Sequence, residues 1–130
     1  MAMDKVPARD DKEAYVESLF STVAGKYDLM NTVLSLTRHR AWRRFAVRKA
    51  RLKPGDSALD VCCGTGDFAL ELAKAVGENG RVVGVDFSES MLDVAGAKAA
   101  RRGMRRIEFV AANTCELPFD NDSFDCVTVG

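Results

Sequence analysis

The chain has 130 residues, of which 47% are hydrophobic and 29% charged, and its formal net charge is zero. This composition is typical of one globular domain and excludes a disordered chain. No apolar stretch approaches the roughly 18 residues of a membrane span, and no signal or transit peptide is recognisable, which predicts a cytoplasmic protein. The four cysteines fit neither a zinc spacing nor a disulfide framework, which predicts free buried thiols and no metal site.

The first 54 residues form a basic arm. The first 55 residues carry 12 Lys and Arg against 6 Asp and Glu, whereas the remaining residues carry 7 against 13. Apolar residues at near-helical spacing predict helices over 11–24 and 41–50, and a Pro-Gly-Asp turn then ends the arm. The sequence therefore divides into a helical arm, 1–54, and a second unit, 55–130.

Strand and helix patterns alternate through the second unit. Because right-handed crossovers join strands that are separated by helices, an α/β fold with a parallel sheet is expected. The predicted strands are 57–62, 81–86, 107–111 and 124–129, and the predicted helices are 67–76 and 88–102. Doubly wound sheets usually have about five to seven strands, so we expect an incomplete sheet, a fragment of a longer protein, and self-association through the exposed strand 124–129.

A glycine-rich stretch follows the first predicted strand. Gly64 and Gly66 belong to a loose G-x-G-x-x-A pattern, and Asp86 follows 22 residues after Gly64, at the end of the second strand. In nucleotide-binding folds such glycines let the backbone approach a ligand, and the acid accepts hydrogen bonds from ribose hydroxyls. The pattern predicts adenosine recognition; the alternative is a tight turn followed by a solvated strand end.

The charge of the residues around the glycine-rich stretch discriminates between cofactors that contain adenosine. Residues 54–73 contain four carboxylates and no Lys or Arg, so a pyrophosphate would meet like charge. S-adenosylmethionine carries a sulfonium and an ammonium group and is favoured for that reason. Two alternatives stay open: an NAD-binding oxidoreductase domain, and a non-catalytic, truncated cofactor-binding module.

A third polar site follows the strand predicted at 107–111. The Asn113 amide oxygen can accept a hydrogen bond from the adenine amino group, and its N–H can donate to a ring nitrogen; Thr114 adds a main-chain N–H. Asn is also a common turn residue, which is the alternative interpretation.

Several stretches resemble one enzyme family. They are LDVCCGTGD, VVGVDFSESML and LPFDNDSFDCVTVG, together with YDLMN and RHRAW in the arm. The chain resembles the class I S-adenosylmethionine-dependent methyltransferases that methylate the quinone ring in menaquinone and ubiquinone biosynthesis. The resemblance implies a Rossmann-like fold, S-adenosylmethionine as cofactor, and C-methylation of a prenylated quinol, demethylmenaquinol to menaquinol. Because the family pattern continues beyond VTVG, the chain alone is expected to be inactive.

The resemblance also implies roles for individual residues. Thr65 is expected in the cofactor loop between Gly64 and Gly66, Asp86 on the ribose, and Asn113 with Thr114 beside the adenine.

The methionine end of the cofactor involves a second group. Tyr27 is similar to the family's aromatic residue near this end, and Asp60 and Asp67 are expected near the ammonium group. No catalytic base is assigned, because His39, the only histidine, lies among arginines as a surface or capping residue would.

The arm has a composition suited to a lipid surface. Eight Lys and Arg between residues 38 and 53 are interleaved with Trp42 and Phe45. An anionic membrane, where a long-chain quinol dissolves, would attract such a segment, which predicts peripheral contact at the inner face of the membrane and no nucleic-acid partner. A solvated helix face is an equally weighted alternative.

Overall fold

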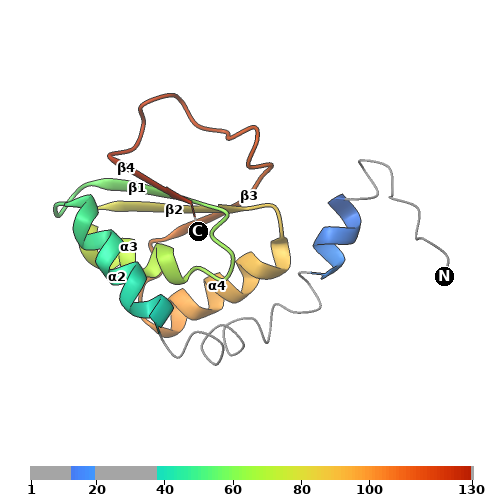
Figure 1. Ribbon diagram of the computed structural model, residues 1–130, viewed down its shortest axis with the longest axis horizontal. Coiled ribbons are helices and arrows are strands. Elements are labelled where there is room, and N and C mark those ends of the chain that lie inside the picture. The colour runs from blue at the N-terminus through green and yellow to red at the C-terminus, as the bar shows by residue number, and fades with distance from the viewer. Residues whose placement is uncertain (1–12, 20–37, 130) are drawn as a thin grey trace.

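The computed structural model describes residues 13–19 and 38–129. Residues 13–19 form a helical segment, and the other elements alternate as expected. These elements are α2 (Arg38–Ala50), β1 (Ser57–Val61), α3 (Asp67–Val76), β2 (Arg81–Asp86), α4 (Glu89–Arg101), β3 (Glu108–Ala111) and β4 (Cys126–Val129). Figure 1 shows that α2, α3 and α4 lie on one side of the sheet, whereas the long connection from β3 to β4 passes over the other.

The four strands form one sheet in the order β3-β2-β1-β4, and every neighbouring pair is parallel. The chain moves outward from β1 to β2 and β3, and then returns to pair β4 with the other side of β1. The winding direction therefore reverses between β1 and β4. In open α/β sheets, ligands bind outside the carboxyl ends of the strands at this reversal. The parallel α/β sheet predicted from the sequence is confirmed.

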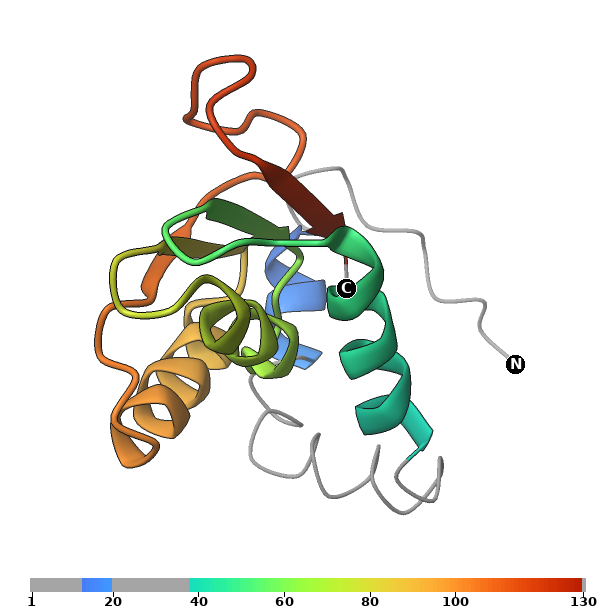
Figure 2. The same cartoon turned by 90° about the vertical axis from the view of Figure 1, so that its left-hand side faces the viewer.

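Each face of the sheet has its own apolar core, because side chains alternate along a strand. On the helical face, Val47 of α2 packs with residues of α3, β1 and β2, which fixes α2 against α3. On the opposite face, Leu59 and Val83 belong to a cluster that Phe119 and Phe124 cover from the β3–β4 connection. Figure 2 shows this connection above the sheet and the helices below it.

Element ends differ from prediction by one to three residues, and the largest difference is at α2, which begins at Arg38 and not at residue 41. β1 ends at Val61, because Cys62 takes a left-handed φ of 57° that cannot continue a strand. β4 begins at Cys126, and Asp125 just before it is joined to Ser57 of β1: its N–H donates to the Ser57 carbonyl, and its carboxylate accepts the Ser57 backbone N–H and hydroxyl. Ser88 precedes α4 and caps it by accepting the Met91 N–H.

β4 lies at an edge of the described sheet, as expected, and Val129 is 72% exposed there. Self-association through this strand stays a prediction. None of the described helices is long and apolar enough to cross a bilayer. Of the four free cysteines, Cys63 is buried as predicted and Cys126 is half-buried, whereas the prediction is wrong for Cys62 and Cys115, which are exposed in loops.

Candidate functional site

The glycine loop (residues 62–66) joins β1 to α3 through left-handed backbone conformations. Gly64 has a φ of 53° and Gly66 a φ of 86°, values that glycine adopts without strain. A Cβ on Gly64 would meet nothing within 4 Å, whereas one on Gly66 would lie 2.9 Å from the Cβ of Ala95 in α4. Gly64 therefore leaves open space beside the backbone, and Gly66 allows close packing of the loop against α4. That both glycines let the backbone approach a ligand stays a prediction, and for Gly66 the structure adds this packing role.

Asp86 closes the glycine loop from the end of β2. One carboxylate oxygen accepts the Gly64 N–H at 2.9 Å, and the other accepts the Ser88 N–H at 3.0 Å. Asp86 thus ties the loop to the start of α4. Each carboxylate oxygen can accept a further hydrogen bond, so both keep capacity for a ligand hydroxyl.

Asp60 is a fully buried acid next to the carboxyl end of β1, and β1 lies between β2 and β4. Its Oδ1 accepts the Thr128 hydroxyl at 2.6 Å, but no donor in the described part of the chain reaches its Oδ2. Burial raises the pKa of Asp60 to about 6, and the charge of Asp86 adds to the rise, whereas Thr128 and Arg43 lower it. Buried polar atoms normally have partners. This orphaned oxygen therefore suits a cationic donor from a ligand.

Asp67 is compensated by two cations from other helices. Lys98 Nζ of α4 lies 2.8 Å from its Oδ1, and Arg43 of α2 lies 3.4 Å from its Oδ2. Lys98 also donates to the Thr65 hydroxyl at 3.2 Å. The expectation of acids without nearby positive charge is thus wrong for Asp67, because the fold brings cations that the local sequence lacks. Asp60 and Asp86 differ from Asp67 in that no cation of the described residues forms an ion pair with their carboxylates.

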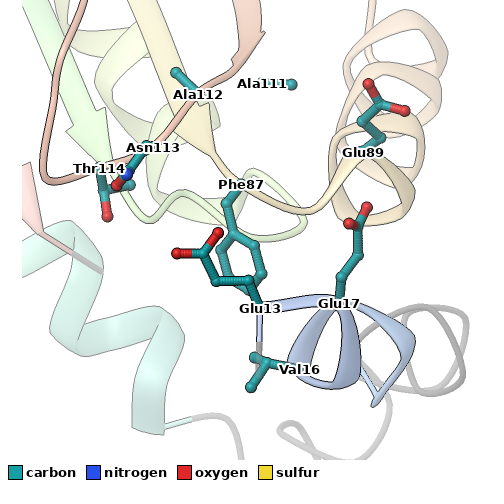
Figure 3. Close-up of a pocket in the computed structure, with 9 residues that line it drawn as sticks. All are labelled: Glu13, Val16, Glu17, Phe87, Glu89, Ala111, Ala112, Asn113 and Thr114. Atoms are coloured by element: carbon teal, nitrogen blue, oxygen red, sulfur yellow. The ribbon is translucent and has the colours of Figure 1, made fainter. Parts of the chain in front are cut away.

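A cavity of about 700 Å³ lies at the carboxyl ends of β2 and β3. Figure 3 shows Phe87, which follows Asp86, between the helical segment 13–19 and the turn that carries Asn113 and Thr114. The aromatic ring of Phe87 can stack on a planar ligand, and the polar groups of the turn at Asn113 and Thr114 can hydrogen bond to the ligand's edge.

Asn113 has a turn function and also lines the cavity. Its side-chain oxygen accepts the Cys115 N–H at 2.9 Å, as in an Asx turn. Asn113 and Thr114 both face the cavity. The two interpretations left open by the sequence are therefore compatible.

Other predicted residues lie elsewhere or were missed. Tyr27 lies outside the described residues, and so does the side chain of His39. The sequence reasoning overlooked Phe87, Lys98 and Thr128. Lys98 had a signal, because it lies three residues after Ala95 on the apolar face of α4.

The chain is similar in sequence to known methyltransferases. The chain is 48% identical over 122 residues to the demethylmenaquinone methyltransferase of Bacillus cereus strain ATCC 10987 / NRS 248, and equally identical over the same length to that of Bacillus anthracis strain CDC 684 / NRRL 3495. Each match covers 94% of this chain and 52% of the relative. The chain thus spans about half the length of the curated relatives it matches.

Solved structures share the fold. The YcgJ protein of Bacillus subtilis matches with a TM-score of 0.64 and 27% identity, covering 70% of this chain and 38% of that one. A SAM dependent methyltransferase from Aquifex aeolicus matches with a TM-score of 0.61 and 28% identity, covering 67% and 46%. The sequence pattern of the ubiE/COQ5 methyltransferase family matches residues 8–130. This match covers nearly the whole chain and confirms the resemblance seen in its motifs: the protein belongs to the ubiE/COQ5 methyltransferase family.

Proposed function

We propose that residues 55–130 bind S-adenosylmethionine as the cofactor-binding part of a C-methyltransferase that converts demethylmenaquinol to menaquinol. The observation that carries the proposal is the buried Asp60 carboxylate, whose Oδ2 has no donor within the described residues, beside the open backbone at Gly64. Family membership and the similarity to demethylmenaquinone methyltransferases support the same reaction. The expected inactivity of the chain alone stays a prediction.

The residues present fit the cofactor's charge and shape. In the proposal, Asp60 Oδ2 accepts a hydrogen bond from the ammonium group of the cofactor. Asp86 accepts hydrogen bonds from the ribose hydroxyls while it holds the Gly64 N–H in place. The cavity lined by Phe87, Asn113 and Thr114 takes the adenine. Thr65 shapes the loop beneath them. Asp67 is left out of the ammonium site, because Lys98 and Arg43 already neutralise it.

For this reaction the protein must align the two reactants and exclude water from the site. When bound, S-adenosylmethionine would supply a methyl group that an electron-rich quinol ring carbon attacks in line, so that the methyl–sulfur bond breaks, S-adenosylhomocysteine leaves, and the ring carbon then loses its proton. Holding the reactants about 3 to 3.5 Å apart replaces a bimolecular encounter by a prearranged one. The buried end of β1 contributes an environment from which water is excluded at Asp60.

Binding of two adenosine ligands tests the proposal directly. We expect S-adenosylhomocysteine, which keeps the ammonium group, to give a calorimetric binding signal with the 130-residue chain, and NAD to give none. Asp86→Ala should weaken binding by at least about tenfold, because both the ribose acceptor and the Gly64 tether are lost. Asp93→Asn, at an exposed site on α4, serves as the matched control. Binding of NAD without S-adenosylhomocysteine would favour the oxidoreductase alternative and refute the proposal.

The proposal includes a route to a lipid-dissolved quinol. On α2, Trp42 is 65% exposed and Phe45 50% exposed, and their rings lie 6.3 Å apart. The sequence of α2, Arg38–Ala50, has no acidic residue. Exposed aromatic rings on a basic helix suit the interface of an anionic membrane, where the rings enter and the cations meet lipid phosphates.

Vesicle sedimentation tests this contact. We expect the chain to bind vesicles that are half phosphatidylglycerol and to ignore pure phosphatidylcholine. Trp42→Ser combined with Phe45→Ser should abolish the binding and lower the melting temperature only slightly, because Trp42 is largely exposed and Phe45 half exposed. Leu117→Ser, at another exposed apolar position, is the control. Equal binding by the double variant and the unaltered chain would dismiss the membrane contact.

A further inference from the structure

One buried lysine contacts the glycine loop from the opposite helix. Lys98 is only 7% exposed, although it lies on α4, whose solvent side carries other charged residues. Its ammonium donates to Thr65 Oγ1 at 3.2 Å and to Asp67 Oδ1 at 2.8 Å. These two acceptors flank Gly66. A single cation therefore holds the chain on both sides of the loop's second glycine.

Burial makes this contact more than a surface ion pair. Lysine is rarely buried unless paired, because taking an ammonium out of water is costly without good acceptors. Lys98 also follows Ala95 by one turn of α4, and Ala95 is the residue against which Gly66 packs. The same face of α4 thus supplies both an apolar contact to Gly66 and a polar contact to each of its neighbours.

A second cation leaves Lys98 with a distinct task. Arg43 of α2 lies 3.4 Å from the other oxygen of Asp67, so the Asp67 charge keeps a partner when Lys98 is removed. The Thr65 hydroxyl accepts a hydrogen bond from Lys98. Neutralising Asp67 is therefore shared between two helices, and Lys98 in addition links Thr65 to Asp67 across Gly66.

We propose that Lys98 is a positioning residue for the glycine loop: by holding Thr65 and Asp67 together, it keeps the Gly64–Gly66 backbone in the conformation that the cofactor needs. Lys98 itself does not touch the cofactor. The inference deepens the proposed function and rests on it for its effect on affinity, but the effect on the loop is independent of any ligand.

Calorimetry with S-adenosylhomocysteine provides the first measurement. Lys98→Met should raise the dissociation constant about tenfold, the effect expected when a charge-assisted hydrogen bond that orders a loop is lost. Lys98→Arg should recover most of the affinity, because it keeps the charge and the donors. Lys74→Met is the matched control, since Lys74 is an exposed lysine of α3 paired with Glu71 outside the loop. A purely structural lysine would lower the melting temperature in Lys98→Met and leave the dissociation constant unchanged.

Amide spectra of the ligand-free chain provide the second measurement. In ¹⁵N–¹H correlation spectra, Lys98→Met should move or broaden the Thr65 and Gly66 signals, and Lys74→Met should leave them in place. Unchanged loop signals overturn the inference whatever the affinity does. If the unaltered chain fails to bind S-adenosylhomocysteine, the proposed function falls, whereas these spectra still decide whether Lys98 positions the loop.

Discussion

Replacing Asp60 by Asn removes the buried charge and so measures how much that charge destabilises the folded chain. Burial raises the pKa of Asp60 from its ordinary value of 3.8 to about 6, so folding disfavours the ionised carboxylate. At about 1.4 kcal/mol for each step of one in pKa, the rise corresponds to about 3 kcal/mol of lost stability at neutral pH. This is the magnitude that Asp60→Asn removes.

The sign of the pH dependence follows from proton binding. Between pH 3.8 and about 6 the folded chain holds a proton on Asp60 that the unfolded chain has released. The destabilisation is therefore absent below the unfolded pKa, grows as pH rises, and is fully present above the folded pKa. Relative to Asp60→Asn, the unaltered chain should lose about 2 kcal/mol of stability between pH 4 and pH 7, since part of the effect precedes pH 4.

Urea unfolding of both chains at several pH values measures this difference. The Asn side chain can still accept the Thr128 hydroxyl, but its amide group takes the place of the unpartnered Oδ2 and costs about 1 to 3 kcal/mol if it finds no acceptor. That cost is independent of pH, so the slope of the difference reports the carboxyl alone. A flat difference for Asp60→Asn would refute the reasoning.

Two further predictions concern the glycine loop and the sheet edge. Gly66→Ala should destabilise the chain by about 2 to 3 kcal/mol in urea unfolding, because the new Cβ would lie 2.9 Å from that of Ala95. Gly64→Ala should cost only about 1 kcal/mol, since its Cβ meets nothing within 4 Å. Equal losses of stability would contradict the packing role of Gly66. Light scattering at high concentration should detect self-association through β4, and Val129→Lys should reduce it, because a charge on an exposed edge opposes strand pairing; a clean monomer of the unaltered chain would count against the contact.

The sequence predicted the order and type of the elements well, because strand and helix in this fold are signalled locally. The apolar run before Cys62 identifies β1, and the helical spacing of Ala69, Leu72 and Val76 identifies α3, each without knowledge of the other elements. The positions of Gly64 and Asp86 at strand ends were predicted for the same reason. Element ends were less accurate, because the bond from Ser57 to Asp125 depends on pairing between distant strands.

Contacts between elements account for what the sequence did not predict. A count of charges over residues 54–73 contains no cation, yet Lys98 lies 31 residues after Asp67 and Arg43 lies 24 before it. The strand alternation of β4 does not reveal that Thr128 donates to Asp60, because that bond requires β4 to return beside β1. Local charge counts therefore overestimate how acidic the folded loop is.

In the folded site, fewer acids are available to attract a cationic cofactor than the sequence of the loop contains. Asp67 cannot attract a ligand cation without displacing Lys98 or Arg43, so the field at the end of β1 comes from Asp60 and Asp86. Their mutual repulsion contributes to the raised pKa of Asp60. A ligand ammonium at Asp60 would offset both the desolvation of its carboxylate and the repulsion from Asp86. This attraction requires the carboxylate to be ionised. Affinity for S-adenosylhomocysteine should therefore rise with pH up to about 6 and level off above it, and the Asp60→Asn chain should lack this rise.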